Sequence, residues 1–239
     1  LFLILNSTVK YNSSATTKSA ETISTNVRTT IESFNDDDLK TFNGIFRHSK
    51  LTGQIDDTDT AITSNTLSVT LSKLFTPDTT QSKGYNIYYN NKFFNPHTEH
   101  NKASGGIVAS TGFGISGQTG LEFFFDDDGA GNLRIYRLVS GIRTYYNSTA
   151  GTVDYTNGTI TITPLFISSV SNYDGTSQTQ IRVTSIPDSL DVVPKRNQLL
   201  EIDTVNSTVL SQVDTVSVGN DSGNVSFTTT SSTPTSSSY

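Results

Sequence analysis

The sequence predicts an α+β chain: a short helical lead, then a mainly antiparallel β-rich domain and an extended C-terminal arm. Three observations support this fold class. An apolar stripe of helical period lies early in the chain, short alternating segments follow, and the last residues have few core-forming side chains. These changes divide the 239 residues into a strand and helical lead at 1–52, a β-rich domain at 53–205 and a Ser/Thr-rich arm at 206–239.

The composition limits the chemistry that the chain can perform. It has 16 Lys+Arg against 22 Asp+Glu, a net charge of −6, and no Cys, Met or Trp. Without cysteine, a disulfide scaffold, a thiol nucleophile and a cysteine-ligated metal are excluded. The mild acidity argues against nucleic acid or an anionic membrane as the main partner. A chain that starts at Leu1 and lacks methionine is expected to be processed or part of a longer protein.

Hydroxyl residues are unusually frequent, with 32 Ser and 38 Thr. Such a composition is typical either of strands with wet outer faces or of disorder. The 13 Phe and 10 Tyr are spread through most of the chain and are enough to build a core, which favours an ordered β domain.

The lead contains a strand and two predicted helices. Leu1–Val9 is apolar enough to form a strand or a buried entry segment. One apolar stripe predicts a first helix, formed by Ala20, Ile23, Val27, Ile31 and Phe34. Its Thr and Asn residues have low helix propensity, so packing must stabilise it.

The second predicted helix begins at Asn35 as a cap, with Asp36, Asp37 and Asp38 at the positive end of the helix dipole. Its apolar face would hold Leu39, Phe42, Ile45 and Phe46, and the helix would end near His48. A metal site made by the three carboxylates is the less favoured interpretation.

Alternation indicates strands after about Gly53, first at Leu67–Leu71 and Tyr85–Tyr89. The clearest hairpin is 153–162, where Asn157-Gly158 predicts a type I′ turn that places Tyr155 opposite Ile160 and Val153 opposite Ile162. A second hairpin joins Leu121–Phe125 to Leu133–Val139 through a turn at Asp126–Asn132. Further strands are expected at Ile181–Val183 and Leu199–Ile202.

Two segments invite a metal interpretation. Asp126, Asp127 and Asp128 precede Gly129, but an EF-hand alignment puts Phe124 and Ile135 at the first and last ligand positions, so a polar turn is favoured over calcium.

The second segment is His97-Thr98-Glu99-His100. Its histidines are three apart in a loop after Pro96, whereas the zinc-protease pattern needs a spacing of four on a helix. The remaining histidine, His48, is the only candidate third imidazole ligand, and a surface loop is the favoured interpretation.

Catalytic signatures are weak. Glu122 and Asp126 are possible glycosidase carboxylates, but no spacing selects them as a pair. Gly112–Gly117 imitates a dinucleotide fingerprint without a βαβ context, and Lys195-Arg196 is too small a basic cluster for nucleic acid. The sequence therefore predicts no catalytic residue, no cofactor, no metal and no small-molecule substrate.

Several segments together resemble the C-terminal part of the large wedge subunit of T4-type phage baseplates, particularly those of cyanobacterial and marine myophages. The likeness runs from about Leu51 to the end, and the first fifty residues carry less of it. The segments that carry it are Asn95–Gly106, Asp126–Asn132, Ala150–Gly158, Ile186–Ser189, Asp191–Gln198 and the tail that closes on Tyr239.

The resemblance implies a non-enzymatic structural subunit of the virion that is assembled in the host bacterial cytoplasm. In that family the subunit forms dimers, pairs with other wedge proteins and links neighbouring wedges into a ring around the hub, which reorganises when the sheath contracts. The resemblance also implies that Val192–Asn197 is a packed extended segment near an interface. Because the tail lacks core-forming residues of its own, we expect it to be an arm that orders on assembly.

We expect the contacts to lie on hydroxyl-rich strand faces. The alternative is a carbohydrate-binding β-sandwich of a viral receptor-binding or adhesin protein, in which Tyr145 and Tyr146 stack on sugars. A glycan-cleaving enzyme is the least supported interpretation.

Overall fold

The computed structural model describes residues 1–41, 44–98, 106–173, 175–195 and 198–216. In chain order the elements are β1 (Phe2–Tyr11), α1 (Ala20–Phe34), the π-helical turn η1 (Asn35–Leu39), α2 (His48–Asp56), β2 (Ile62–Phe75), β3 (Lys83–Tyr88), β4 (Ala109–Ser110), β5 (Phe113–Ile115), β6 (Phe124–Asp127), β7 (Asn132–Val139), β8 (Ile142–Asp154), β9 (Thr159–Leu165), β10 (Ile167–Val170), β11 (Ile181–Ser185), β12 (Glu201–Ile202) and β13 (Thr208–Val213). The prediction of an α+β, mainly β fold is confirmed.

Eleven strands form one sheet in the order β12-β1-β2-β11-β4-β6-β7-β8-β9-β3, and β13 also pairs with β1. The pairs of β1 with β12 and β13 are parallel, and the other described pairs are antiparallel. A second, two-stranded sheet joins β5 and β10.

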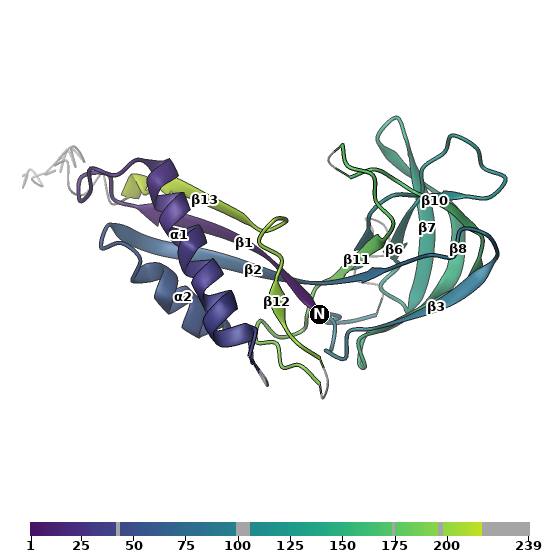
Figure 1. The fold of residues 1–239 in the computed structure, drawn as a ribbon, viewed down its shortest axis with the longest axis horizontal. Coiled ribbons are helices and arrows are strands. Elements are labelled where there is room, and N and C mark those ends of the chain that lie inside the picture. The colour runs from purple at the N-terminus through teal and green to yellow at the C-terminus, as the bar shows by residue number, and fades with distance from the viewer. Residues whose placement is uncertain (42–43, 99–105, 174, 196–197, 217–239) are drawn as a thin grey trace, which may run out of the picture.

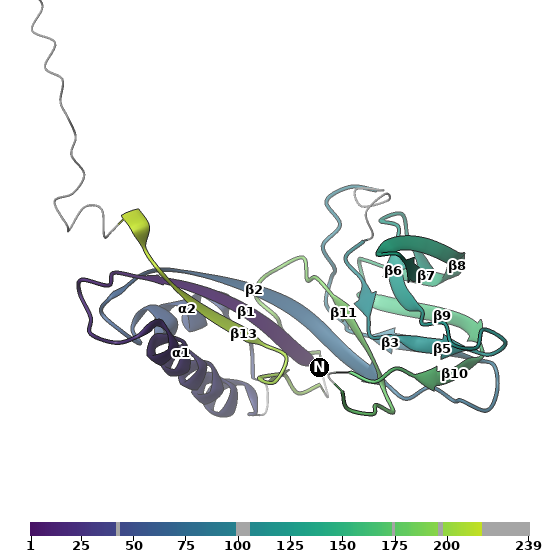
Figure 2. The same ribbon diagram turned by 90° about the horizontal axis from the view of Figure 1, so that it is seen from above.

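The molecule is elongated and has two lobes (Figures 1 and 2). The first lobe contains β1, α1, α2, most of β2, β12 and β13, and the second contains β3 to β10. The long strand β2 and strand β11 connect the lobes. Because the chain leaves the first lobe after β2 and returns to it at β12, the second lobe is inserted between two parts of the first.

Helix α1 covers one face of the first-lobe sheet, as Figure 2 shows from above. The side chain of Ser19 caps the helix by accepting a hydrogen bond from the Thr22 N–H. The predicted stripe is buried through Ile23, Val27, Ile31 and Phe34, so the predicted helix over 20–34 is confirmed. On the sheet side, alternate residues of β1 are buried against this helix: Leu3, Leu5, Val9 and Tyr11. Strand β1 is the strand expected at the start of the chain.

The second helix, predicted from an Asn35 cap to near His48, does not form as one helix, because only the turn η1 at Asn35–Leu39 is helical among the described residues between α1 and α2. The chain continues from α1 into η1, because the Asn35 N–H still bonds to the helix and the Asn35 side chain accepts the Ile202 N–H at 2.7 Å instead of capping a new helix. The second helix is α2, which begins at His48, and Asp191 from far along the chain accepts the His48 N–H at 2.9 Å. Phe42, assigned to the predicted apolar face, lies outside the described residues.

The hairpin at 153–162 is present as β8 and β9, but its predicted register is wrong. Val153 pairs with Ile160, two residues away from the predicted partner. Asn157 does not have the positive φ of a type I′ turn, because Asp154 accepts both its backbone and side-chain N–H groups. A shift of two residues preserves the faces, so the predicted apolar side still points into the core.

The second predicted hairpin is confirmed by β6 and β7, and the strand at 181–183 by β11. Of the strand predicted over 199–202, only β12 forms. Stacked aromatic rings fill the second lobe, among them Phe113 and Phe125 with centroids 4.5 Å apart. No helix in the described ranges is long and apolar enough to cross a membrane.

Candidate interaction surfaces

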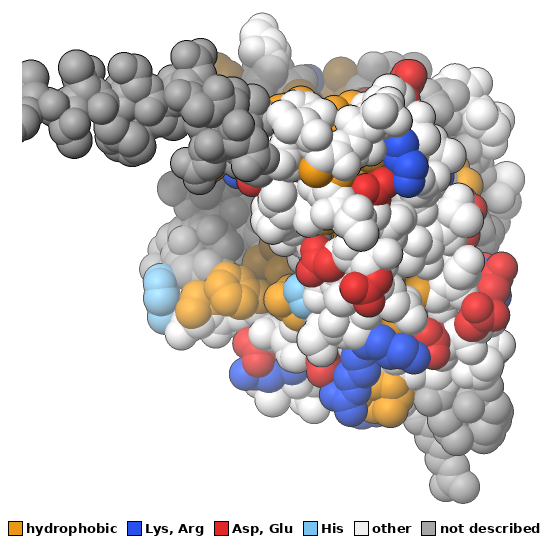
Figure 3. Space-filling view, turned by 90° about the vertical axis from the view of Figure 1, so that its left-hand side faces the viewer, with side chains coloured by type: hydrophobic (Ala, Val, Ile, Leu, Met, Phe, Trp, Pro, Cys, Tyr) orange, Lys and Arg blue, Asp and Glu red, His pale blue; other side chains and the backbone are white. Residues whose placement is uncertain are grey.

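The first-lobe sheet has one face that no helix of the described residues covers, here called the open face. The even-numbered residues of β1 lie on it, beside alternate residues of β2 and β13. It carries mainly hydroxyl and amide side chains: Asn6, Thr8, Ser64, Thr66, Ser68, Thr208 and Gln212, with Lys10, Ile4 and Leu210 among them. Seen end-on, the first lobe shows a largely white surface of other side chains and backbone, with scattered Asp and Glu, groups of Lys and Arg, and some apolar patches (Figure 3). The hydroxyl-rich strand face expected from the sequence is therefore present.

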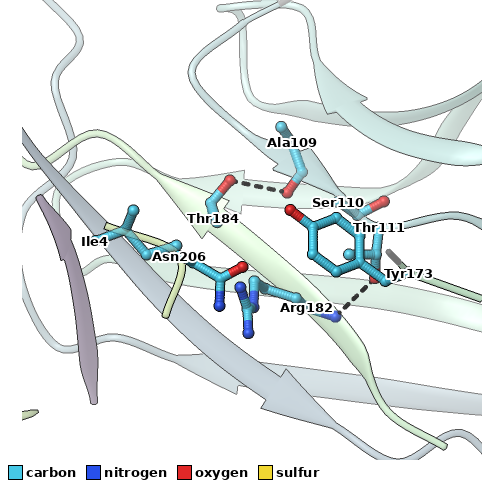
Figure 4. Close-up of a pocket in the computed structure, with 8 residues that line it drawn as sticks. All are labelled: Ile4, Ala109, Ser110, Thr111, Tyr173, Arg182, Thr184 and Asn206. Carbon is cyan, nitrogen blue, oxygen red and sulfur yellow. Dashed lines mark hydrogen bonds between the residues drawn. The ribbon is translucent and has the colours of Figure 1, made fainter. Parts of the chain in front are cut away.

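A cleft lies where the lobes meet, at the end of the open face (Figure 4). It has a volume of about 200 Å³ and is lined by Ile4, Ala109, Ser110, Thr111, Tyr173, Arg182, Thr184 and Asn206. A neighbouring hollow of about 430 Å³ shares Tyr173, Arg182 and Asn206 with it. The two spaces together form a groove above β11 that is lined by both polar and apolar groups.

Arg182 is the charged group of this cleft. One of its Nη atoms lies 3.1 Å from Asp203, which also accepts two bonds from the side chain of Asn206. The Arg182 Nε is buried and has no hydrogen-bond partner among the described residues. Because Nε is buried, only the partly exposed end of the Arg182 guanidinium, which is paired with Asp203, can reach a group in the cleft. Tyr173, half exposed beside it, offers a ring face.

The acidic turn considered for calcium is a buried network in the second lobe. Asp126 accepts bonds from Arg134 at 2.9 Å, Arg143 at 2.7 Å and Tyr145 at 3.0 Å. Asp128 closes the turn by accepting bonds from Ala130 and from both nitrogens of Asn132. These carboxylates are bonded to protein donors, which is the geometry of a polar turn.

Asp127, between them, is fully buried. It accepts the N–H of Val108 at 2.8 Å and the hydroxyl of Tyr155 at 2.6 Å. Burial, and then this bond to a carboxylate, raises the pKa of Tyr155. Burial pushes the pKa of Asp128 up, but the bonds from Asn132 outweigh it and the pKa lies below its ordinary value.

The histidines do not meet in the described part of the chain. His97 is exposed and its Nδ1 lies 3.3 Å from the Thr98 carbonyl, whereas His48 begins α2 and its Nε2 lies 3.0 Å from the Leu67 carbonyl. Glu99 and His100 lie outside the described residues. Within those residues, no group of three His, Asp or Glu side chains is arranged to hold a metal ion.

The other residues that the sequence suggested as sites take part in packing, strand pairing or hydrogen bonds within the protein. Asp126 is too buried to reach a sugar, and its carboxylate is paired with Arg134 and Arg143. Gly112–Gly117 contains strand β5, which pairs with β10 and does not precede a helix. Of the two tyrosines considered for sugar stacking, Tyr145 bonds to Asp126, while Tyr146 packs on Phe123 with centroids 5.0 Å apart.

Of the segment Val192–Asn197, which the resemblance implies is packed, Val192 is buried, whereas Val193 and Lys195 are exposed. Val192 exchanges two backbone bonds with Phe46, each 3.0 Å long. Among the exposed apolar side chains of the described residues are Tyr88, Phe94, Ile186, Leu190, Val193 and Leu199. Arg196 and Asn197 lie outside the described residues.

Sequence reasoning missed the cleft and the strand β13. The cleft combines residues from segments far apart in the chain, and no local sequence pattern predicts that such segments lie close together. For β13, the alternation Val209, Ser211, Val213 was a usable signal, since these residues face the helices.

Residues 1–74 match a family model described as baseplate structural protein gp6, C-terminal domain III. The matched segment contains β1, α1, α2 and almost all of β2, which form most of the first lobe. No curated protein matches the chain significantly. The match supports a structural protein of a phage tail baseplate that contacts other baseplate proteins.

Proposed function

We propose that the chain is a non-enzymatic structural subunit of a contractile-tail baseplate wedge, where it links wedges into a ring around the hub. The observation that carries this proposal is the family match over the first lobe, which coincides with a folded unit of β1, α1, α2 and β2. The resemblance of the later segments to the wedge subunit of T4-type phages points to the same role. We place the mature subunit in the virion and its assembly in the host cytoplasm.

The shape of the molecule suits a linking role. Two lobes joined through β2 and β11 present separate surfaces at opposite ends (Figure 1). We propose that one end makes a homotypic contact and the other contacts different wedge proteins. The open face provides many hydroxyl and amide groups for such contacts, and interfaces of this kind are commonly polar and hydrated.

Sheath contraction would then change the angle between attached neighbours while each lobe stays intact. The buried apolar side chains form one continuous cluster through both lobes, and the connection between the lobes is a narrow part of the sheet. Bending at this connection would disturb fewer packed side chains than unfolding either lobe, and each Å² of apolar surface kept buried contributes about 25 cal/mol.

The test mixes the purified chain with the other wedge proteins of the same phage and measures the molar mass of the products by light scattering. Co-assembly into a complex of defined mass is expected. Persistent monomers would contradict the proposal, and monomers that also bind glycans saturably would favour the adhesin alternative. An Arg182→Gln variant reports whether the cleft takes part, since its complex should be weaker if an acceptor from a neighbour binds there.

A further inference from the structure

Strand β13 has a sheet neighbour on one side only. It pairs with β1 from Asn6↔Thr208 to Tyr11↔Val213, and no other described strand pairs with it. Figure 2 looks directly onto this edge and shows β13 in front of β1, with no helix or strand drawn over it. One row of its backbone groups is therefore free of sheet hydrogen bonds.

The direction of these backbone groups follows from one hydrogen bond. Asp214 donates its N–H to the Tyr11 carbonyl at 2.8 Å, so even-numbered residues here turn their backbone groups toward β1. Along a strand these groups alternate in direction. Val209, Ser211 and Val213 therefore direct their N–H and C=O groups outward from the sheet.

This edge lacks the features that keep sheet edges from pairing. Such features are charged residues, proline, bulges and very short strands. At the opposite end of the sheet, β3 begins with Lys83 and has a register shift between Lys83 and Tyr85. By contrast, Thr208–Val213 has neither charge nor proline, pairs without a register shift, and exposes about half of Leu210.

We propose that β13 pairs antiparallel with β13 of a second copy across a two-fold axis, which makes one continuous sheet from two first lobes. This inference rests on the proposed function, because it assigns the surface of the homotypic contact. The edge is uncharged, so two copies meet without repulsion, and each copy offers the same outward backbone groups. A two-fold contact requires such self-complementarity.

The side chains select the register. With Leu210 on the axis, it faces Leu210 of the partner subunit on the open face, and Val209 and Ser211 exchange backbone bonds with the other copy. Opposite residues then share a face, as pairing in a sheet requires. This register also buries the largest exposed apolar side chain of the strand.

A contact made by a six-residue strand is small beside the roughly 1,200–2,000 Å² that stable interfaces bury. The free protein should therefore dimerise weakly, and the contact would gain strength in a ring, where other contacts hold the copies together. A method that traps transient pairs is the right test.

Cysteine crosslinking supplies this test, because the chain has no native cysteine. In the proposed register Leu210 and its counterpart form a non-hydrogen-bonded pair, with Cα atoms about 4.5 Å apart, which suits a disulfide. Leu210→Cys should crosslink under mild oxidation at least about tenfold faster than the controls Thr208→Cys and Val205→Cys. Val205 is exposed but outside the strand, and Thr208 would face Gln212 of the partner subunit.

Equal rates for the three variants would overturn the proposal. A second measurement uses Leu210→Lys, which puts like charges opposite each other on an exposed position and should lower the dimer fraction in light scattering. If the dimer fraction of Leu210→Lys equals that of the wild type, the homotypic contact lies elsewhere. The β13 proposal is then wrong, while the proposed function still holds. If Leu210→Cys crosslinks but the crosslinked dimer does not co-assemble with wedge proteins, the strand pairing holds and the proposed function fails.

Discussion

The hydroxyl of Tyr155 donates a hydrogen bond of 2.6 Å to Oδ2 of the buried Asp127. The same carboxylate accepts N–H groups from Val108 and Gly129. One side chain therefore joins the β6–β7 turn, the start of β4 and the β8–β9 loop. Since a buried carboxylate needs donors, this bond should contribute measurably to the stability of the second lobe.

Tyr155→Phe should lower the free energy of unfolding by about 1.5–3 kcal/mol, because it removes a hydrogen bond to a charged group and leaves that group partly unsatisfied. The midpoint of urea denaturation at pH 7 measures the change. Tyr146→Phe is the matched control, since Tyr146 is half exposed and keeps its ring contact with Phe123. Its effect should stay within about 0.5 kcal/mol. Equal losses in the two variants would contradict the proposed importance of the bond.

The raised pKa of Tyr155 predicts that the free energy of unfolding depends on pH in the alkaline range. Burial and then the bond to Asp127 raise the pKa of Tyr155 in the folded chain above the unfolded value of about 10. Its contribution is fully present below pH of about 10 and is lost as pH rises toward the folded pKa. The denaturation midpoint of the wild type should therefore fall as the pH rises above about 10, and more steeply than that of Tyr155→Phe. Parallel curves would show that Tyr155 does not titrate differently on unfolding.

Asp126→Asn tests the buried ion pairs of the same network. The change leaves Arg134, whose Nε lies 2.9 Å from the carboxylate, buried beside a neutral amide. Breaking such a pair should cost about 3–5 kcal/mol of unfolding free energy. Asp188→Asn is the control, because the Asp188–Lys92 pair is equally short at 2.9 Å but exposed, and its loss should cost under about 1 kcal/mol. Similar costs in calorimetry or urea denaturation would show that burial does not strengthen the pairing.

Local patterns predicted the elements whose stabilising contacts are local. The apolar stripe from Ala20 to Phe34 predicted α1, since its period is a property of the helix's own residues. The prediction of the second helix was wrong because the helix starts at His48, whose N–H is bound by Asp191, 143 residues further along the chain. The predicted register of the 153–162 hairpin was wrong because the Asp154 side chain accepts the Asn157 N–H, which makes the turn longer than two residues.

The surfaces were less predictable than the elements. The hydroxyl-rich strand face follows from alternation along β1 and β2, which the sequence displays. The groove at the lobe junction does not, because Arg182, Tyr173 and Asn206 come together only after the second lobe is inserted between β2 and β12. Of the arm predicted at 206–239, Thr208–Val213 form β13 in the first-lobe sheet. The part beyond residue 216 lies outside the described residues, so its role as an arm stays a prediction.

Two glycines offer a final pair of opposite predictions. Gly158 ends the β8–β9 turn at φ +62°, and a Cβ there would lie 1.9 Å from the Asn91 carbonyl oxygen, close to where the Tyr89 N–H bonds to the Gly158 carbonyl. Gly158→Ala should therefore lower the free energy of unfolding by more than about 1 kcal/mol, through strain and the displaced backbone.

Gly53 lies inside α2, and a Cβ there meets nothing within 4 Å. Gly53→Ala should raise the free energy of unfolding by about 0.5–1 kcal/mol, because alanine loses less backbone entropy in a helix. Urea midpoints of both variants, measured against the wild type, check the two signs. Destabilisation by both would mean that α2 does not form as described, and tolerance of Gly158→Ala would mean that the β3 end is not held against the turn.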